Sequence, residues 1–144
     1  MRVIVQRAKD AKCIIDNEIY SSIDFGYLLL VGFTYGDDIN TINKMIKKIL
    51  NLRIFEDENG KMNLNIKQVN GKILSISQFT LYANPNDGNR PSFIDALSPD
   101  KATVLYDKFN ELLSQEIEVG TGIFGADMSI SFTNFGPCTI TLEF

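Results

Sequence analysis

The fold of this chain is decided by the stretch YLLLVGF, residues Tyr27–Phe33. The stretch has the length of a strand, and its apolar side chains follow one another almost without interruption. A strand with one face in water would carry a polar residue at every second position, so an unbroken run indicates burial on both faces. We therefore expect this strand to be covered on both sides.

Further strands are expected where apolar and β-branched residues gather between turn residues. Asp16-Asn17 is such a turn, and it predicts a hairpin between the segments on either side of it. The strands expected from this pattern are Val3–Val5, Ala11–Ile15, Glu18–Tyr20, Leu52–Phe55, Lys72–Leu81, Glu116–Val119, Met128–Phe132 and Cys138–Leu142.

Two segments carry the spacing of a helix with one apolar face. Apolar residues recur every three or four positions from Ile39 to Leu50, and Asp37 or Asp38 can cap the first turn. Before the second segment, Ser98 is placed as N-cap and Pro99 as the first helical residue. The apolar face of this second helix is expected from Leu105, Tyr106, Phe109, Leu112 and Leu113. Residues 84–91, rich in Asn, Pro, Asp and Gly, predict a loop.

Two helices together with these strands predict an α/β fold in one compact domain, residues 1–144. We expect the strands to form a β/β/α layered, barrel-like arrangement with the two main helices on one side. The longest apolar run is too short to cross a bilayer, and basic residues break the start of the chain, so neither a membrane partner nor a signal peptide is expected. Cys13 and Cys138 have no metal-type spacing, and we expect reduced core thiols in a cytoplasmic protein without a bound metal.

The net charge of −4 is unevenly distributed along the chain. Residues 1–72 hold 11 basic and 9 acidic side chains, whereas residues 73–144 hold 3 and 9. Because non-specific nucleic-acid binding depends on neutralising phosphates, the negative net charge disfavours a DNA partner. A local group of basic residues could still bind one end of an RNA. The candidate basic residues are Arg2, Arg7, Lys9 and Lys12, and also Lys44, Lys47 and Lys48, for which a solvated helix face is the simpler interpretation.

The chain has no histidine, which excludes the Ser-His-Asp and Cys-His catalytic arrangements. Gly120–Gly125 matches the G-x-G-x-x-G pattern of dinucleotide-binding folds, but a strand pattern follows it where that fold requires a helix. We therefore interpret these glycines as turn residues and expect no cofactor. Asp57 and Glu58 are adjacent in a turn and Asp127 stands alone, so a pair of converging carboxylates finds no support.

Two short segments remain as candidates for chemistry: Ser77–Tyr82 and Asn134–Thr139. In the first, Thr80 is a candidate nucleophile and Gln78 a candidate ligand for a carbonyl or oxyanion; the alternative is that both only satisfy neighbouring backbone groups. In the second, Gly136-Pro137 alone is typical of a turn between two strands, and a trans peptide bond is the ordinary expectation.

Together with the rest of the chain, these segments resemble the D-aminoacyl-tRNA deacylase family. The resemblance rests on seven strings in family order: Met1–Val3 with Gln6-Arg7, Leu52–Asp57, Gly60–Leu64, Ser77–Tyr82, Arg90–Phe93, Gly122–Met128 and Asn134–Thr139. The chain departs from the family at Asn86-Asp87, where lysines are common, at Asn65 and Cys138, and at Phe135, where an acid is frequent. The first departure weakens the expected grip on RNA phosphates.

The resemblance implies an enzyme that hydrolyses the ester between a D-amino acid, or mischarged glycine, and the 3′ end of tRNA, as a proofreading step in translation. It implies a homodimer in which Gly136-Pro137, in the cis form, completes the active site of the other subunit and rejects L-amino acids. Arg7 resembles the arginine that holds this motif, and Asn134 belongs to the same string. Phe124 and Met128 would border the terminal adenosine.

The catalytic segment implied by the resemblance is Ser77, Gln78, Phe79 and Thr80. We expect backbone N–H groups near Phe79 and Thr80 to stabilise the oxyanion, and the ribose 2′-hydroxyl of the tRNA to activate water. Thr80 as a covalent nucleophile is the rival mechanism. Two other functions stay open at this point: a non-catalytic dimeric protein that binds tRNA ends, and a general hydrolase of small esters.

Overall fold

The computed structural model describes residues 1–86 and 88–144, so that Asp87 lies outside the described residues. The described part contains seven strands and two α-helices. The strands are β1 (Arg2–Ile15), β2 (Glu18–Gly32), β3 (Phe55–Glu56), β4 (Met62–Leu64), β5 (Lys72–Ser77), β6 (Val119–Thr121) and β7 (Ser129–Glu143). The helices are α1 (Ile39–Asn51) and α2 (Pro99–Ser114), with a short 3-10 helix, η1 (Phe79–Tyr82), between them.

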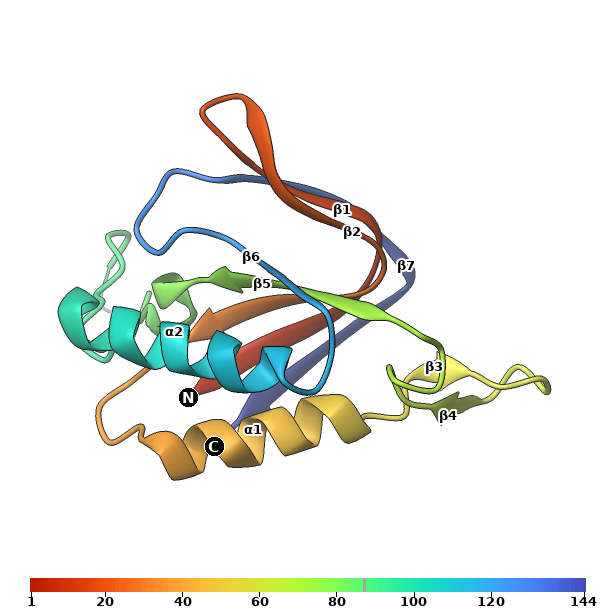
Figure 1. Cartoon of the computed structure of the whole chain (residues 1–144). Helices are drawn as coiled ribbons and strands as arrows, with labels where there is room; N and C mark the ends of the chain where they lie inside the picture. Colours follow the sequence, from red (N-terminus) through yellow and green to blue (C-terminus); the bar gives the residue numbers. More distant parts are fainter. Residues whose placement is uncertain (87) are drawn as a thin grey trace.

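Five strands form one mixed sheet in the order β6-β5-β2-β1-β7 (Figure 1). β1 pairs antiparallel with β2 and β7, whereas β5 pairs parallel with β2 and β6. β3 and β4 form a separate small hairpin that projects from the body of the molecule. The stretch Tyr27–Phe33 thus supplies the central strand, which explains its unbroken apolar character.

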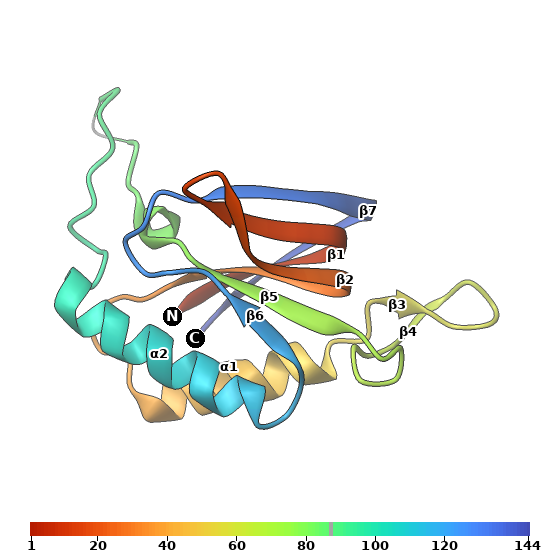
Figure 2. The same ribbon diagram turned by 45° about the horizontal axis from the view of Figure 1, so that its top comes forward.

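Both faces of this central strand are covered, as the sequence predicts. On one face Tyr27, Leu29 and Val31 pack with residues of α1 and α2, and the two helices lie together on that side (Figure 2). On the other face Leu28 packs with Ile23 and other apolar residues from the curled ends of β1, β2 and β7. The expected β/β/α layering with both helices on one side is therefore confirmed.

The close approach of β5 to β2 requires glycine at position 26. Gly26 has a φ of +142°, and a Cβ atom added there would overlap the backbone of Lys72, its partner on β5. Only a residue without a side chain lets the two strands pair at this point.

The choice between Asp37 and Asp38 as helix cap is settled by their hydrogen bonds. Asp38 accepts from the backbone N–H groups of Asn40 and Thr41 at 2.9 and 3.0 Å and caps α1. These bonds hold the pKa of Asp38 below its usual value, the one from Thr41 contributing most. Asp37 instead pairs at 2.5 Å with the amino group of Met1, which also donates to the Phe144 carbonyl at 2.8 Å, so the two chain ends lie together.

Several of the expected strands have different bounds. Val3–Val5 and Ala11–Ile15 are parts of one continuous strand, β1, and Glu18–Tyr20 and Tyr27–Phe33 are parts of β2, which ends at Gly32. The strand expected at Lys72–Leu81 ends at Ser77, because its partner β2 ends at Gly32 and the chain then turns into η1. Leu52–Phe55 is wrong as a strand, since pairing begins only at Phe55, opposite a short strand that the pattern did not indicate, β4. The strand expected at Glu116–Val119 lies three residues later, as β6.

The C-terminal strands differ from the expectation at the Gly136-Pro137 segment. Met128–Phe132 and Cys138–Leu142 are parts of one 15-residue strand, β7, and the interpretation of Gly136-Pro137 as a turn is wrong. The peptide bond between these two residues is cis, as the family resemblance implies. Among the described residues, no helix is both long and apolar enough to cross a membrane.

Candidate active site

One cavity, of about 280 Å³, brings together two segments that are far apart in the sequence. One wall comes from Ile76–Phe79, at the end of β5, and the other from Phe124–Met128, just before β7. Five of the residues predicted for the site line it: Ser77, Gln78, Phe79, Phe124 and Met128.

The carbonyl of Ser75 fixes the position of these two walls. It accepts one hydrogen bond from the Tyr106 hydroxyl at 2.7 Å and another from the backbone N–H of Gly122 at 3.0 Å. Burial raises the pKa of Tyr106 above its usual value, so the phenol keeps the proton that it donates. The carbonyl therefore joins β5, α2 and the segment that leads to Phe124.

Thr80 lies next to the cavity and is bound by a carboxamide. Gln78 Nε2 donates to Thr80 Oγ1 at 2.5 Å. A carboxamide is neither an acid nor a base at neutral pH, so this bond orients the hydroxyl without activating it as a nucleophile. Within the described residues, no acceptor pairs with the backbone N–H of Phe79 or Thr80, and both residues are exposed.

The second predicted segment forms a bulge in β7. Gln6 of β1 pairs with Thr139, and Ala8 pairs with Asn134. Between these two pairs β1 has one residue, Arg7, whereas β7 has four, residues 135–138. The additional residues bend away from the pairing, and Gly136 and Pro137 at their centre are exposed.

Arg7 holds this bulge from inside. Its Nε and Nη2 atoms donate to the Phe135 carbonyl at 3.2 and 3.1 Å, and Nη1 donates to the Ile54 carbonyl at 3.1 Å. The guanidinium also lies 4.7 Å from the centre of the Phe135 ring. Arg7 is 3% exposed, and no described carboxylate lies within ion-pair distance of it. Arg7 therefore stabilises the backbone of the bulge, and its guanidinium is too buried to bind an RNA phosphate.

Asn134 closes the bulge from its other side. Its Oδ1 atom accepts from the backbone N–H of Cys138 at 3.1 Å, and its Nδ2 atom donates to Thr139 Oγ1 at 3.0 Å. Gly136 has a φ of +111°, and a Cβ atom there would overlap Arg7 Nη2. The backbone of the bulge is therefore held by side chains on both sides of an obligatory glycine.

The bulge and the cavity do not meet within one chain. None of the residues that line the cavity comes from Asn134–Thr139. The bulge lies on β7 and the cavity at the end of β5, which are three strand spacings apart in the sheet. Along the strands the two are four residues apart, because Arg7, beside the bulge, pairs with Tyr27 of β2, whereas Ser77 pairs with Val31 of β2. This separation corresponds to roughly 15–20 Å.

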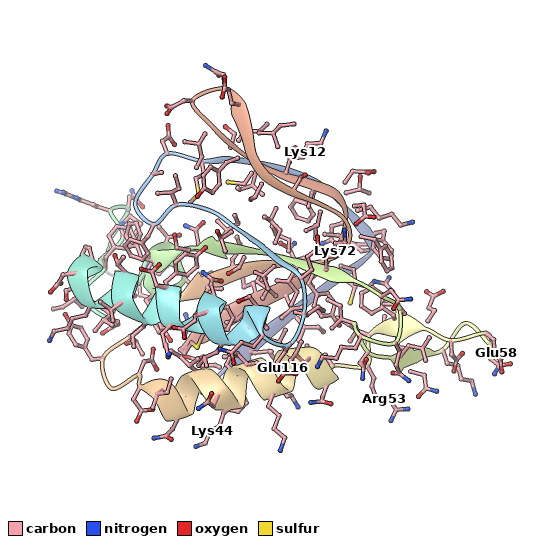
Figure 3. All side chains as sticks on the ribbon, viewed as in Figure 1. Lys12, Lys44, Arg53, Glu58, Lys72 and Glu116 are labelled. Carbon is pink, nitrogen blue, oxygen red and sulfur yellow. The ribbon has the colours of Figure 1, made fainter. Side chains whose placement is uncertain are left out.

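The basic residues considered for RNA lie on different sides of the molecule. Figure 3 shows Lys12 near the β1–β2 hairpin and Lys44 on the outer side of α1, at opposite edges. Arg2 forms an ion pair with Glu143, with 2.9 Å between Nη2 and Oε1, and Lys9 Nζ lies 4.7 Å from the centre of the Phe135 ring. In the described part of the chain, no group of three His, Cys, Asp or Glu side chains is placed to hold a metal ion.

Several residues of the cavity were not predicted from the sequence. Gly125, Ala126 and Asp127 line it, although the glycine-rich stretch was interpreted only as a turn. These three residues belong to Gly122–Met128, one of the strings that resemble the family, and this membership could have indicated that they lie in the site. Phe93, which packs against Phe79 at 5.1 Å between ring centres, belongs to another of the strings and received no role.

Comparison with known proteins gives matches along the whole chain. The family model described as D-Tyr-tRNA(Tyr) deacylase matches residues 4–143. A D-aminoacyl-tRNA deacylase from Lactobacillus gasseri is 53% identical over 144 residues, with 99% of each chain covered. A D-aminoacyl-tRNA deacylase from Anoxybacillus flavithermus is 52% identical with the same coverage.

Two solved structures share the fold. One, described as a c-Myc DNA unwinding element binding protein, has a TM-score of 0.95 at 36% identity and covers 100% of this chain and 99% of its own. The other, of a probable eukaryotic D-amino acid tRNA deacylase, has a TM-score of 0.82 at 16% identity, with 99% and 98% covered.

We expect Arg7→Met to lower the free energy of unfolding by about 3 kcal/mol, because it leaves the Phe135 and Ile54 carbonyls unpaired where Arg7 was buried. Urea unfolding at one fixed protein concentration measures the change. Arg53→Met is the matched control, since Arg53 is exposed and makes a single bond, to the Asn63 carbonyl at 2.8 Å. Equal losses in the two variants would contradict the bracing role of Arg7.

Proposed function

Because the chain belongs to the D-Tyr-tRNA(Tyr) deacylase family, we propose that it hydrolyses the ester bond between a D-amino acid and the 3′ end of tRNA. The observation that carries this proposal is the 53% identity to a curated D-aminoacyl-tRNA deacylase over essentially the whole of both chains. The protein is then a proofreading ester hydrolase of translation, and we place it in the cytoplasm with its tRNA substrate. The net charge of −4 supports the expectation of no DNA partner.

The cavity supports a mechanism that relies on the backbone and on the substrate. An aminoacyl ester is already activated, so stabilising the tetrahedral oxyanion can supply much of the acceleration; one such donor is worth about 3–4 kcal/mol. We assign this task to the free backbone N–H groups of Phe79 and Thr80. The ribose 2′-hydroxyl next to the ester then activates the attacking water, and Gln78 and Ser77 position the substrate.

Thr80 fits this mechanism better as a positioned hydroxyl than as a nucleophile. Its partner is the Gln78 carboxamide at 2.5 Å, which cannot accept the proton that a nucleophilic hydroxyl must lose. Phe124 and Met128, on the facing wall of the cavity, are then placed to border the terminal adenosine.

Rejection of L-amino acids is assigned to Gly136-Pro137 of a second copy of the chain. A backbone carbonyl facing the substrate α-carbon collides with an L side chain and leaves a D side chain free, which is selection by exclusion. The exposure of this dipeptide, its distance from the cavity of its own chain and its bracing by Arg7 and Asn134 support this role.

A homodimer would also cover the edge of the sheet. β7 is the terminal strand in the strand order and is 15 residues long. A long strand edge left open is a site for association with another chain, so a partner on this side serves both solubility and the active site.

We expect the protein to release free tyrosine from D-tyrosyl-tRNA and to leave L-tyrosyl-tRNA at its uncatalysed rate. The measurement is the amino acid released over time from each charged tRNA. Binding of D-tyrosyl-tRNA without release would favour a non-catalytic protein that binds tRNA ends. Comparable turnover of simple tyrosine esters would favour a general esterase.

The Thr80→Ala variant is expected to keep its rate of deacylation to within about tenfold, the worth of one lost hydrogen bond. Removal of a covalent nucleophile would instead cost on the order of a millionfold. A D-tyrosyl-tRNA ending in 2′-deoxyadenosine should react about a hundredfold more slowly or worse, because the assisting hydroxyl is missing. A dead Thr80→Ala variant together with full activity on the deoxy substrate would reverse the assignment.

Subunit exchange between two variants tests whether the site is shared. Gln78→Ala disables the cavity of its own chain, and Gly136→Ala displaces the rejecting dipeptide of its own chain, because a Cβ atom there would overlap Arg7 Nη2. The Gly136→Ala homodimer should therefore deacylate both D- and L-tyrosyl-tRNA. In each mixed dimer one site combines an intact cavity with an intact dipeptide and the other has neither, so exchange in equal amounts should halve the turnover of L-tyrosyl-tRNA and leave that of D-tyrosyl-tRNA unchanged. Undiminished turnover of L-tyrosyl-tRNA, in a mixture shown to contain mixed dimers, would place cavity and dipeptide in one chain.

A further inference from the structure

Two aromatic side chains at the rim of the cavity are paired with each other and still open to solvent. The rings of Phe79 and Phe93 pack edge to face, 5.1 Å apart at an angle of 62°. Phe79 remains 52% exposed and Phe93 40% exposed. Contiguous exposed apolar surface is typical of binding sites, and two adjacent phenylalanine rings beside a cavity form such a surface.

The segment that carries Phe93 is held in place by backbone hydrogen bonds. Asn84 and Ser92 exchange two such bonds, at 2.8 and 2.9 Å. The N–H of Ala96 donates to the Phe93 carbonyl at 3.0 Å, and Leu97 is bonded to the end of β2 through the Phe33 carbonyl at 2.9 Å. Phe93 is therefore presented to Phe79 by a backbone anchored on both sides.

We propose that Phe79 and Phe93 form a platform on which the base of the penultimate nucleotide of the tRNA stacks. This inference rests on the proposed function, which puts the terminal adenosine in the cavity between Phe124 and Met128. Phe79 lines that cavity and also packs against Phe93, which does not line it, so the pair of rings extends beyond the cavity. The nucleotide that precedes the adenosine then leaves the cavity over these rings.

Aromatic platforms suit this part of the substrate. Stacking of a base on an aromatic ring binds single-stranded nucleic acid without requiring a dense cluster of positive charge. The chain has a net charge of −4, and Asn86 stands where the family commonly has a lysine, so stacking replaces part of the phosphate attraction. The platform also gives the enzyme a means to prefer tRNA over a free aminoacyl-adenosine.

Equilibrium binding of stable amide analogues tests the platform without requiring turnover. The probes are adenosine carrying D-tyrosine on a 3′-amide, the same compound with a cytidine added on its 5′ side, and a third compound with an abasic nucleotide in place of that cytidine. We expect the cytidine to lower Kd about tenfold for the wild type, and the abasic nucleotide to give little of this gain. Phe93→Leu should remove the gain and leave Kd for the adenosine analogue unchanged.

Ile94→Ala is the matched control, because Ile94 is the adjacent residue, is 77% exposed and has no ring; it should keep the tenfold gain. The proposal is overturned if Phe93→Leu weakens both analogues equally, if it changes neither, or if it shifts the dimer dissociation constant, which would place the pair in a subunit interface. Failure of the proposed function gives a different result, namely absence of turnover of D-tyrosyl-tRNA while the cytidine gain persists.

Discussion

The three hydrogen bonds of the Arg7 guanidinium are the interaction on which the proposed site depends most. They join the carbonyl of Phe135, one residue before Gly136, to the carbonyl of Ile54 at the entrance of β3. A buried cation without a carboxylate partner is costly, and here carbonyl oxygens and the Phe135 ring compensate for the lost hydration. The planar fork of arginine suits this role, because its separate nitrogen atoms reach two carbonyl oxygens in fixed directions, whereas the three donors of a lysine ammonium all lie on one nitrogen. The bulge of β7 thus has a defined geometry although it makes no ladder pairs with β1.

The walls of the cavity are likewise held by hydrogen bonds to a backbone carbonyl, here that of Ser75. The Ser75 carbonyl is a single acceptor that receives the Tyr106 hydroxyl and the Gly122 N–H, and through them fixes α2 and the Phe124–Met128 segment relative to β5. At Gly122 an added Cβ atom would lie 2.5 Å from Met128 Sδ, so a larger residue there would displace the Met128 side chain that lines the cavity. Side chains such as Arg7, Asn134 and Tyr106 bind backbone groups, and in the proposed mechanism other backbone groups of these segments face the substrate.

The parts of this structure that could be predicted from the sequence are those with local causes. The run Tyr27–Phe33 predicted the central strand because burial on both faces leaves a direct mark in composition. The starts of both helices also follow from local signals, although the sequence left Asp37 and Asp38 open as the cap of α1, and Ser98 precedes α2 without a side-chain capping bond. The bounds of β5 and the continuity of β7 could not be predicted in this way. β5 ends at Ser77 because its neighbour ends, and β7 continues through Gly136-Pro137 because Arg7, 128 residues away, holds the backbone there.

The site was predictable only in part for a related reason. Five of the residues named from the family resemblance line one cavity, but periodicity cannot reveal that Ser77 and Phe124 lie on facing walls of it. A site made of side-chain acids and bases can be recognised in a sequence by those residue types. A site made of backbone N–H and C=O groups can be recognised only through the residues that shape the backbone. The absence of histidine from the chain fits such a site.

Backbone groups also suit the discrimination that the proposed reaction requires. D- and L-amino acids carry the same side chains, so a pocket that binds the side chain cannot separate them reliably over many amino acids. A fixed obstacle beside the α-carbon discriminates by chirality alone, whatever the side chain of the amino acid. Such an obstacle must be rigid, since a shift of about 1 Å would admit the wrong hand. Bracing of Gly136 by a buried arginine on one side and by Asn134 on the other provides that rigidity. In the proposed homodimer, presentation of this dipeptide by the second chain would leave the cavity open for the RNA end.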